Sequence, residues 1–388
     1  MRLLEAARVA RRKRAWMLRP ATAPKIANAA RAALAFVAGA EHVKAPPLLV
    51  KVDLSPVCNL RCTVCVHAGA GAGDERIAAQ TFRKGQSMPL EQYGRLIDEL
   101  RGQAIAVSLY TWGDPLLYRD LDAACAMTTA AGLGSHISSN LSMPLSDARL
   151  ASLVESGLGH ITVCVDGLTQ ATYAKTRVGG EIEVVLDNLR RLVAARDRAR
   201  GPRLFVEMQF IRFRHNAHEE ERARALAAEL RVDAFASFWG SLHNMGDLMP
   251  DRYRTAAPLG RAAAPRCTWP FFATVVKYNG DVVPCCDFRA AAQYIGPESR
   301  GDAEARVLGN VFETSLTDVW NSEAYRAIRR LVTNPARTPE AERASSFCDG
   351  CPRCFRTDVA ETRWLGAEDH DFDAIYTEER RGRPVRRR

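Results

Sequence analysis

Short apolar runs alternate with longer segments of helical periodicity through the first two thirds of the chain. Runs rich in β-branched and other apolar residues predict strands over 49–54, 104–110, 135–139, 160–165, 204–211 and 233–238. Between them, apolar residues recur at helical spacing and predict helices over 89–100, 146–156, 182–196 and 219–230. Alternating strands and helices form βαβ units on a parallel sheet, but these units are too few for a closed eight-stranded barrel. The pattern predicts an α/β fold, either a doubly wound open sheet or a partial barrel, with ligands at the carboxyl ends of the strands.

The same pattern divides the chain into five parts. Residues 1–46 are rich in alanine and arginine and predict a basic helical N-terminal extension, and 47–245 hold the βα units. An irregular linker with prolines, 246–266, precedes a cysteine-bearing segment at 267–360, which we expect to form a small α+β domain. Residues 361–388 form a tail of mixed charge that ends in arginines.

Composition and charge restrict the class of protein. The chain is 47% hydrophobic and 26% charged, as in ordinary globular domains, and it contains no apolar run long enough to predict a transmembrane helix. The N-terminus lacks the apolar core of a secretory signal, so we expect a cytoplasmic protein. Much of the net charge of +9 lies at the two ends. Since no basic motif is interleaved with aromatic residues, we expect solvated ends rather than nucleic-acid binding. Binding of an acidic substrate or an acidic protein partner is the alternative.

The eleven cysteines are the most informative feature of the composition. An odd number in a chain without an export signal disfavours a disulfide framework. Nine of them form three groups, at 58/62/65, 267/285/286 and 348/351/354. Clustered thiols in a reducing compartment predict metal sites. The eight histidines, by contrast, have no metal-like spacing, and we expect them to be exposed or locally bonded.

The first cysteine group follows the first predicted strand with the spacing C-x3-C-x2-C. Three thiolates on one short loop can hold three corners of an iron–sulfur cubane and leave the fourth iron open to another ligand. A closed zinc site with His67 as the fourth ligand is the alternative, although this spacing is unusual for zinc ribbons.

This loop, placed directly after a strand, resembles that of the radical S-adenosylmethionine (SAM) superfamily. The resemblance implies a partial (β/α)6 barrel over about residues 48–240, with a SAM-binding [4Fe–4S] cluster on Cys58, Cys62 and Cys65. It also implies reductive cleavage of SAM to a 5′-deoxyadenosyl radical that abstracts a substrate hydrogen, and a reducing partner such as flavodoxin or ferredoxin. Val64 departs from the aromatic residue usual at its position.

Three further predicted strand ends resemble SAM-binding segments of that superfamily. The segment 111–116 is similar to its Gly-Gly-Glu-Pro motif, although an ordinary Gly-Asp-Pro turn is the alternative. The segments 138–140 and 162–167 are similar to its Thr-Asn and Ser-x-Asp-Gly segments. The resemblance implies SAM contacts from Trp112, Gly113, Asp114, Pro115, Ser138, Ser139, Asn140 and Asp166.

The alternation of side chains along the strands gives four catalytic candidates. Cys164 lies on the polar face of the fourth strand, where a thiol can donate a hydrogen atom to a substrate radical; a small core cysteine is the alternative. Glu207 and Gln209 share one face of the fifth strand, where a buried charge needs a partner. Arg177 lies in a segment that resembles these enzymes, which implies contact with a carboxylate or hydroxyl of SAM or substrate.

The second cysteine region contains Asn-Gly at 279–280 between two apolar runs, which predicts a hairpin. The hairpin would bring Cys267 and Cys285 to one end, and with two later thiols they can form a closed site for zinc or a [4Fe–4S] cluster. The layout resembles the SPASM and shorter twitch extensions of radical SAM enzymes, which implies one auxiliary [4Fe–4S] cluster. The implied ligands are Cys267, Cys285, Cys348 and Cys351, with Cys354 as an alternative.

Three functions are compatible with these features. The leading one is a radical SAM oxidoreductase that dehydrogenates or epimerises a sugar or aminocyclitol, because the late cysteines resemble those of aminocyclitol dehydrogenases. The second is a maturase of a ribosomal peptide, disfavoured because 1–46 is short for a winged-helix peptide-recognition domain. The third is a non-catalytic zinc-binding interaction protein. We therefore expect a small-molecule or peptide substrate, with no nucleic acid and no membrane as partner.

Overall fold

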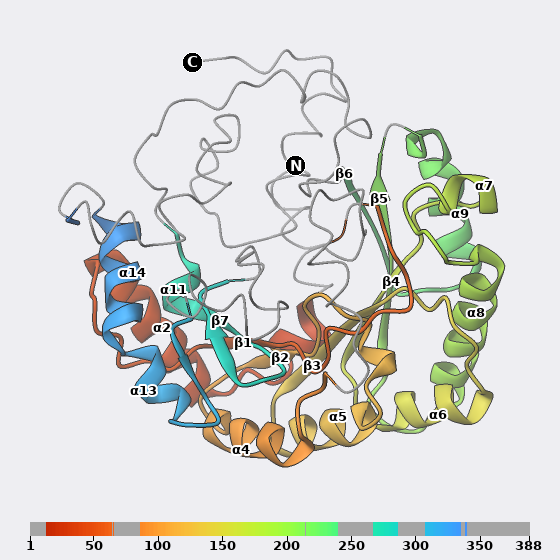
Figure 1. The fold of residues 1–388 in the computed structure, drawn as a ribbon. Coiled ribbons are helices and arrows are strands. Elements are labelled where there is room, and N and C mark those ends of the chain that lie inside the picture. The colour runs from red at the N-terminus through yellow and green to blue at the C-terminus, as the bar shows by residue number, and fades with distance from the viewer. Residues whose placement is uncertain are drawn as a thin grey trace.

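Nine strands form one curved sheet in the part of the chain that the structure describes. The structure is a computed structural model, and it describes residues 13–63, 65, 86–213, 215–239, 267–285, 307–334 and 338–339. The strand order is β6-β5-β4-β3-β2-β1-β7-β8-β9. The sheet bends into an open barrel, and the labelled helices lie in an arc along its outer side (Figure 1).

All six predicted strands are present and parallel to their neighbours. They are β1 (Leu49–Val52), β2 (Ala106–Ser108), β3 (Gly134–Ser139), β4 (His160–Cys164), β5 (Phe205–Arg212) and β6 (Ala234–Trp239). Since the described helices cover the outer side, the partial barrel is confirmed and the doubly wound sheet, which needs helices on both faces, is not the fold.

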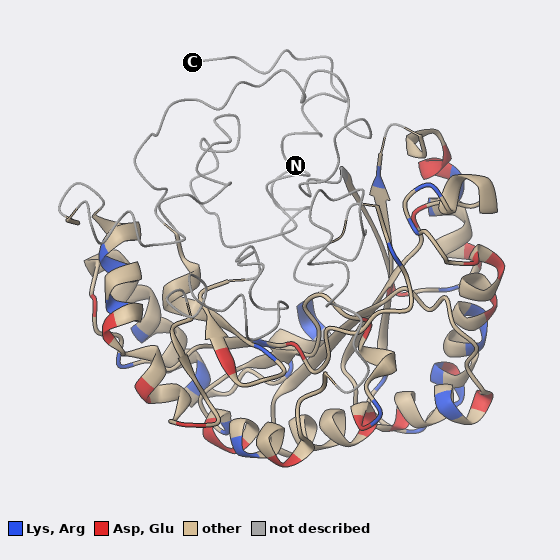
Figure 2. Cartoon of the chain, viewed as in Figure 1, with Lys and Arg blue, Asp and Glu red and all other residues tan. Residues whose placement is uncertain are grey.

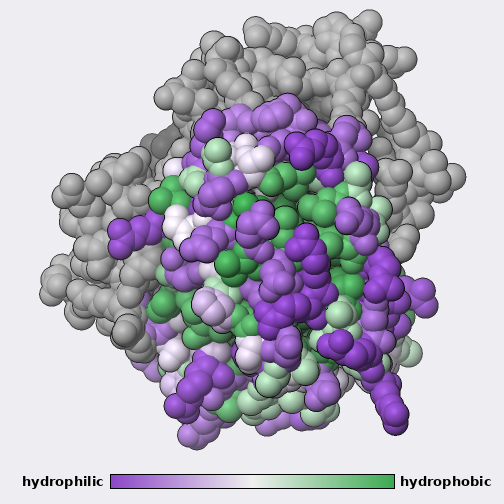
Figure 3. Space-filling view, turned by 90° about the vertical axis from the view of Figure 1, so that its right-hand side faces the viewer, coloured by the Kyte–Doolittle hydropathy of each residue, from purple (hydrophilic) through white to green (hydrophobic). Residues whose placement is uncertain are grey.

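The helices between these strands bury one apolar face against the sheet. They are α4 (Leu90–Leu100), α5 (Leu121–Ala130), α6 (Asp147–Glu155), α8 (Ile182–Arg198) and α9 (Glu220–Glu229). In α8, Val185, Leu189 and Leu192 recur at helical spacing and are buried. Charged residues lie mainly on the outer helices (Figure 2), and on the face drawn in Figure 3 hydrophilic residues are interspersed with apolar ones. No helix within the described ranges combines the length and apolarity needed to cross a membrane.

The second cysteine region continues the barrel sheet. After α11 (Trp269–Phe272), β7 (Ala273–Val276) pairs in parallel with β1. The predicted hairpin is present, since β8 (Asp281–Val283) pairs antiparallel with β7, and its turn uses Gly280 at φ 88°. The strand β9 (Gly309–Asn310) follows, with α13 (Leu316–Trp320) in contact with it, and α14 (Glu323–Thr333) lies beside α11, which also contacts α2 (Figure 1).

The N-terminal extension closes the amino end of the barrel with η1 (Arg14–Leu18) and α2 (Ala23–Ala38). The ring of Trp16 is buried and stacks on His136 of β3, with 4.7 Å between centroids. Its backbone lies so close to Gly134 that a Cβ there would be 2.8 Å from the Trp16 Cα and nearer still to its carbonyl oxygen. The ammonium of Lys25 donates to the carbonyl of Gly132 at 2.6 Å. The extension is therefore part of the barrel's packing.

Trp16→Ala should lower the free energy of unfolding by about 3–5 kcal/mol, because a fully packed aromatic side chain is replaced by a cavity. Leu18→Ala is the matched control, since Leu18 is 53% exposed and its truncation should change stability by about 0.5 kcal/mol or less. Urea denaturation followed by circular dichroism measures both. A loss below about 1 kcal/mol for Trp16→Ala would show that the extension does not stabilise the barrel.

Candidate active site

The loop after β1 carries the first cysteine group at the carboxyl edge of the sheet. Cys62 is buried, and Cys58 and Cys65 are half-buried. The amide of Leu60 donates to Cys58 Sγ at 3.5 Å, and the guanidinium of Arg177 donates to Cys62 Sγ at 3.7 Å. Within the described ranges, no three His, Cys, Asp or Glu side chains are grouped so that they could hold a single metal ion. What makes this loop suitable for an iron–sulfur cluster is its three soft thiol donors and the hydrogen bonds that point at two of their sulfurs.

Burial raises the pKa of the Cys58 thiol, and the nearby carboxylate of Asp114 raises it further. An isolated thiol at this place would therefore stay protonated at neutral pH. A bound metal ion reverses this preference, because a coordinating thiol loses its proton outright. The site therefore favours a thiolate only when a bound cation compensates its negative charge.

The segment after β4 holds the cysteine loop from one side. The amides of Arg61 and Thr63 donate to the carbonyls of Val178 and Thr176, at 3.0 Å each. These bonds make a short ladder between the two segments, so the position of Arg177 is coupled to that of the cysteines.

Gly113, after β2, holds the loop from the other side. A Cβ at Gly113 would lie 2.7 Å from the carbonyl oxygen of Val57 and nearer still to that of Ser55. The amide of Asp114 donates to the same Val57 carbonyl at 2.9 Å. Glycine is required here because the backbones of two loops meet.

Gly113→Ala should separate the two loops and reduce the bound iron and sulfide by up to about half, the share of one of the two clusters, since the cysteine loop loses its support. Gly201→Ala is the control, because a Cβ at Gly201 meets nothing within 4 Å. Iron and sulfide analysis after anaerobic reconstitution provides the comparison. Equal iron in the two variants would mean that the contact at Gly113 does not support the cluster.

Asp114 joins the ends of β2 and β3. Its buried carboxylate accepts hydrogen bonds from the Leu116 amide (3.1 Å), the Ser139 hydroxyl (2.9 Å) and the Asn140 amide (2.8 Å). Burial raises its pKa, and the donors at Asn140, Leu116 and Ser139 oppose the rise. The sequence predicts SAM contacts for Asp114 and Ser139, and these stay predictions; in the structure their side chains tie the two loops together.

Three other predicted SAM contacts lie around the same loops. The side-chain amide of Asn140 donates to Asn59 Oδ1 at 3.0 Å and to Cys58 Sγ at 3.9 Å, so it faces the cysteine loop. Pro115 is buried and begins the short helix η3 (Pro115–Leu117). The side chain of Trp112 is half-buried.

Ser138, Cys164 and Gln209 form a row across three neighbouring strands on the inner face of the barrel. Ser138 Oγ and Cys164 Sγ are 3.5 Å apart, and the Cys164 thiol donates to Gln209 Oε1 at 3.8 Å. Burial raises the pKa of Cys164, so this residue stays an S–H group at neutral pH. The structure thus brings together three residues that the sequence proposes separately.

A second polar row lies deeper in the barrel. Glu207 Oε2 is 3.6 Å from His160 Nε2, and His136 Nε2 is 3.0 Å from the hydroxyl of Thr162. Trp16 covers these rings. Glu207 therefore faces buried histidines near the amino end of the sheet rather than the cysteine loop. Alternation along β3 and β4 is the signal that identifies these histidines as internal, and their spacing does not reveal it.

Asp166 and Arg177 bind each other. Arg177 Nε and Nη2 are 2.7 and 2.6 Å from Asp166 Oδ2, and Asp166 Oδ1 accepts from the Ile211 amide at 2.8 Å. Burial alone would lower the pKa of Arg177, but Asp166, Cys164 and Cys62 raise it well above its usual value. The sequence predicts a ligand contact for each residue, and these contacts stay predictions; the structure pairs the two residues beside Cys62.

The second cysteine site lies at the amino end of β7. Cys267 and Cys285 are half-buried and both contact one apolar cluster. This cluster consists of Trp269, Ala273, Val275 and Val283. Cys286, Cys348, Cys351 and Cys354 lie outside the described residues, as do Val64 and His67.

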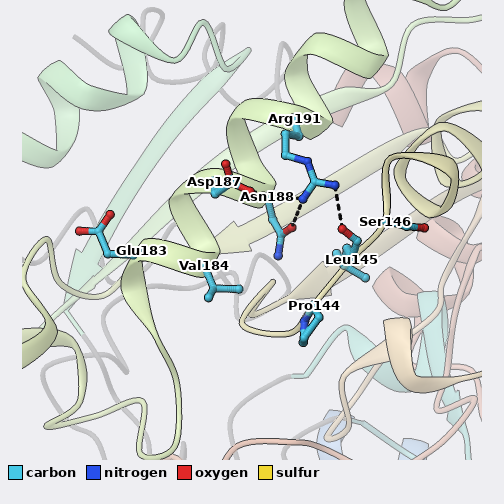
Figure 4. Close-up of a pocket in the computed structure, with 8 residues that line it drawn as sticks. All are labelled: Pro144, Leu145, Ser146, Glu183, Val184, Asp187, Asn188 and Arg191. Atoms are coloured by element: carbon cyan, nitrogen blue, oxygen red, sulfur yellow. Dashed lines mark hydrogen bonds and ion pairs between the residues drawn. The ribbon is translucent and has the colours of Figure 1, made fainter.

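An open pocket of about 600 Å³ lies on the outer side of the barrel, between the loop after β3 and α8 (Figure 4). Arg191 donates to the carbonyl of Leu145 at 2.8 Å and to Asn188 Oδ1 at 3.2 Å. None of the predicted site residues lines this pocket, so it is separate from the candidate site.

Two protein-family models match the chain. The radical SAM superfamily matches residues 52–199, and SPASM, an iron–sulfur cluster-binding domain, matches 267–354. The chain therefore has a radical SAM domain followed by a C-terminal SPASM domain. The two domains imply [4Fe–4S] clusters and SAM as cofactors.

Among curated proteins, the chain is 26% identical over 328 residues to the PqqA peptide cyclase of Xanthomonas axonopodis pv. citri (strain 306). The match covers 79% of this chain and 81% of that relative. The PqqA peptide cyclase of Xanthomonas campestris pv. campestris (strain 8004) is equally similar, at 26% over 328 residues, 79% of this chain and 80% of the relative.

Two solved structures share the fold. Streptococcus suis SuiB has a TM-score of 0.53 and 14% identity, covering 74% of this chain and 68% of its own. Native anSMEcpe with bound AdoMet and Kp18Cys peptide also has a TM-score of 0.53, with 13% identity, 86% of this chain and 96% of its own. At these identities the likeness concerns the fold alone.

Proposed function

We propose that this radical SAM/SPASM enzyme modifies a ribosomally made peptide. The observation that carries the proposal is the similarity to PqqA peptide cyclases over about four fifths of their length. Peptide-bound structures of the same fold support it, namely SuiB with its precursor peptide SuiA and anSMEcpe with a Kp18Cys peptide. Such a partial barrel can therefore admit a peptide.

The leading expectation from the sequence, a sugar or aminocyclitol substrate, is less well supported than the peptide. That expectation relied on the layout of the late cysteines and on the shortness of residues 1–46. The described part of 1–46 packs against the amino end of the barrel, so its length says little about peptide recognition. The zinc-binding alternative has no support from the two iron–sulfur domain matches.

Named residues would hold the two clusters. Cys58, Cys62 and Cys65 would hold the SAM-binding cluster, which with bound SAM supplies a 5′-deoxyadenosyl radical. Cys267 and Cys285, with late cysteines, would hold an auxiliary cluster that accepts an electron.

The chain's own interior residues would position the peptide. Ser138, Cys164 and Gln209 present a hydroxyl, a thiol and an amide on the inner face, and a peptide side chain lying against them would meet donors and acceptors in fixed positions. The Asp114 bonds and the Gly113 contact keep the loops above this row in register.

Anaerobic turnover tests the proposal. The reconstituted enzyme is incubated with SAM, a reductant and short peptides encoded beside its gene, and 5′-deoxyadenosine and peptide mass are followed. We expect peptide-dependent deoxyadenosine and a peptide lighter by two hydrogens, about 2 Da, as ring formation by hydrogen loss requires. Deoxyadenosine stimulated by sugars or aminocyclitols and by none of the peptides would reject it.

Cys164 distinguishes hydrogen loss from epimerisation. In a dehydrogenating reaction, Cys164→Ala should leave the lighter peptide as product and reduce its rate by about tenfold or less, because the thiol only lines the site. An epimerase needs a hydrogen donor, so the same variant would form deoxyadenosine without product. Mass spectrometry in deuterated water separates these cases, and solvent deuterium at a peptide Cα would indicate epimerisation.

A further inference from the structure

Arg177 joins a buried carboxylate to a cysteine of the cluster loop. Its Nε and Nη2 contact Asp166 Oδ2, and its Nη1 donates to Cys62 Sγ at 3.7 Å. The side chain of Arg177 is 15% exposed and that of Asp166 is 2% exposed. Both charged partners are thus withdrawn from solvent, where electrostatic interactions are least screened.

The carboxylate that binds the guanidinium is itself held in place. Asp166 is fixed by the Ile211 amide on its Oδ1, and its carbonyl accepts from the Asn216 side chain at 2.8 Å. Gly167 follows directly, and a Cβ there would lie 2.6 Å from the backbone nitrogen of Tyr173. The turn that returns the chain to Arg177 is therefore tightly packed.

The backbone bonds from Arg61 and Thr63 tie the cysteine loop to the segment that carries Arg177. The N–H group thus keeps a fixed direction toward the Cys62 sulfur.

A hydrogen bond and a positive charge beside a cluster sulfur favour the reduced state, which carries one more negative charge. Hydrogen bonds to the sulfurs, net charge and solvent exposure are the levers by which proteins set iron–sulfur potentials. Asp166 partly offsets the charge of Arg177, but it leaves the directed N–H···S bond in place.

We propose that Arg177, aimed by Asp166, is a positioning residue that raises the reduction potential of the cluster on Cys58, Cys62 and Cys65 through its bond to the Cys62 sulfur. The inference rests on the cluster being held by these cysteines and is independent of the peptide substrate. It assigns Arg177 a role that exists before SAM binds, which differs from the ligand contact implied by the sequence.

Redox titration followed by electron paramagnetic resonance tests the proposal in full-length protein without SAM or peptide. The signal of the SAM-binding cluster is obtained by subtracting the spectrum of Cys58→Ala. At a fixed solution potential, Arg177→Gln should lower the ratio of reduced to oxidised cluster about tenfold, which corresponds to about 59 mV for a one-electron couple. Arg177→Lys keeps the positive charge but loses the planar guanidinium with its several N–H donors. It should lower the ratio of reduced to oxidised cluster about threefold.

Lys175→Gln is the matched control, since it removes the same charge from an exposed side chain two residues away. Solvent and salt screen that charge, so its ratio should stay within about twofold of the parent. A parent-like ratio for Arg177→Gln, with only SAM binding weakened, would overturn the proposal. If Arg177→Gln does not assemble its cluster, Arg177→Lys decides alone, and a ratio within twofold of the parent would overturn it.

Failure of this proposal is distinguishable from failure of the proposed function. The potential is measured without substrate, whereas the peptide assay reads product mass. A parent-like potential together with a modified peptide would reject only the role of Arg177. A shifted potential without any peptide product would reject only the peptide substrate.

Discussion

Cys58→Ala should abolish SAM cleavage while leaving auxiliary iron in the chain. Two remaining thiolates cannot hold a cubane whose fourth iron must stay open for SAM, so the first cluster is lost. The auxiliary site lies at the amino end of β7, away from this loop. We expect deoxyadenosine formation to fall by at least about 10³-fold and bound iron to fall by about half.

Cys125→Ala is the matched control for this result. Cys125 is a buried cysteine on α5 and belongs to the main hydrophobic core. Its truncation should cost about 1 kcal/mol of stability and leave iron content and SAM cleavage unchanged. If Cys58→Ala still forms deoxyadenosine within tenfold of the parent, the assignment of the SAM-binding cluster to this loop is wrong.

The local parts of this site could be predicted from the sequence. Cys58, Cys62 and Cys65 lie within eight residues, so their spacing alone brings three thiols to one loop. Strand alternation likewise places Cys164 and Gln209 inside the barrel, because side chains on a strand follow a period of two.

The bonds between distant segments could not be predicted in the same way. Asp114 and Ser139 resemble ligand-binding positions in a linear motif, yet their mutual bond depends on β2 and β3 lying side by side. The parallel pairing of β7 with β1 joins segments more than 200 residues apart, and no short-range pattern specifies it. Trp16 packs on His136 for the same reason, since a complementary surface exists only once the barrel has formed.

The substrate class was the least predictable property. Cysteine spacing reports the chemistry of clusters, because ligand geometry restricts it, but substrate specificity depends on side chains scattered over several strands. Ser138, Cys164 and Gln209 come from three strands and share no linear motif. The change from a sugar to a peptide as the favoured substrate therefore rests on similarity over most of the chain.

Asp114→Ala should lower the free energy of unfolding by about 3 kcal/mol or more. The substitution removes the acceptor of the Leu116 amide, the Ser139 hydroxyl and the Asn140 amide, and each stranded donor costs about 1–3 kcal/mol, partly offset because a buried carboxyl group is also removed. Asp114→Asn should lower the free energy of unfolding by about 2 kcal/mol. Its side-chain amide has only one accepting oxygen, and its NH2 group would face the groups that donate to the carboxylate. Urea denaturation under anaerobic conditions measures both variants.

Asp114→Ala should also weaken SAM binding by at least about tenfold. Without this carboxylate, the loops after β2 and β3 lose their common anchor beside the cysteine loop. Asp120→Ala is the control, since the side chain of Asp120 is 36% exposed and pairs with the exposed Arg119 at 3.4 Å. It should change stability by about 0.5 kcal/mol or less. A loss below about 1 kcal/mol for Asp114→Ala, with parent-like SAM affinity, would mean that the two loops are held by their backbones and not by this carboxylate.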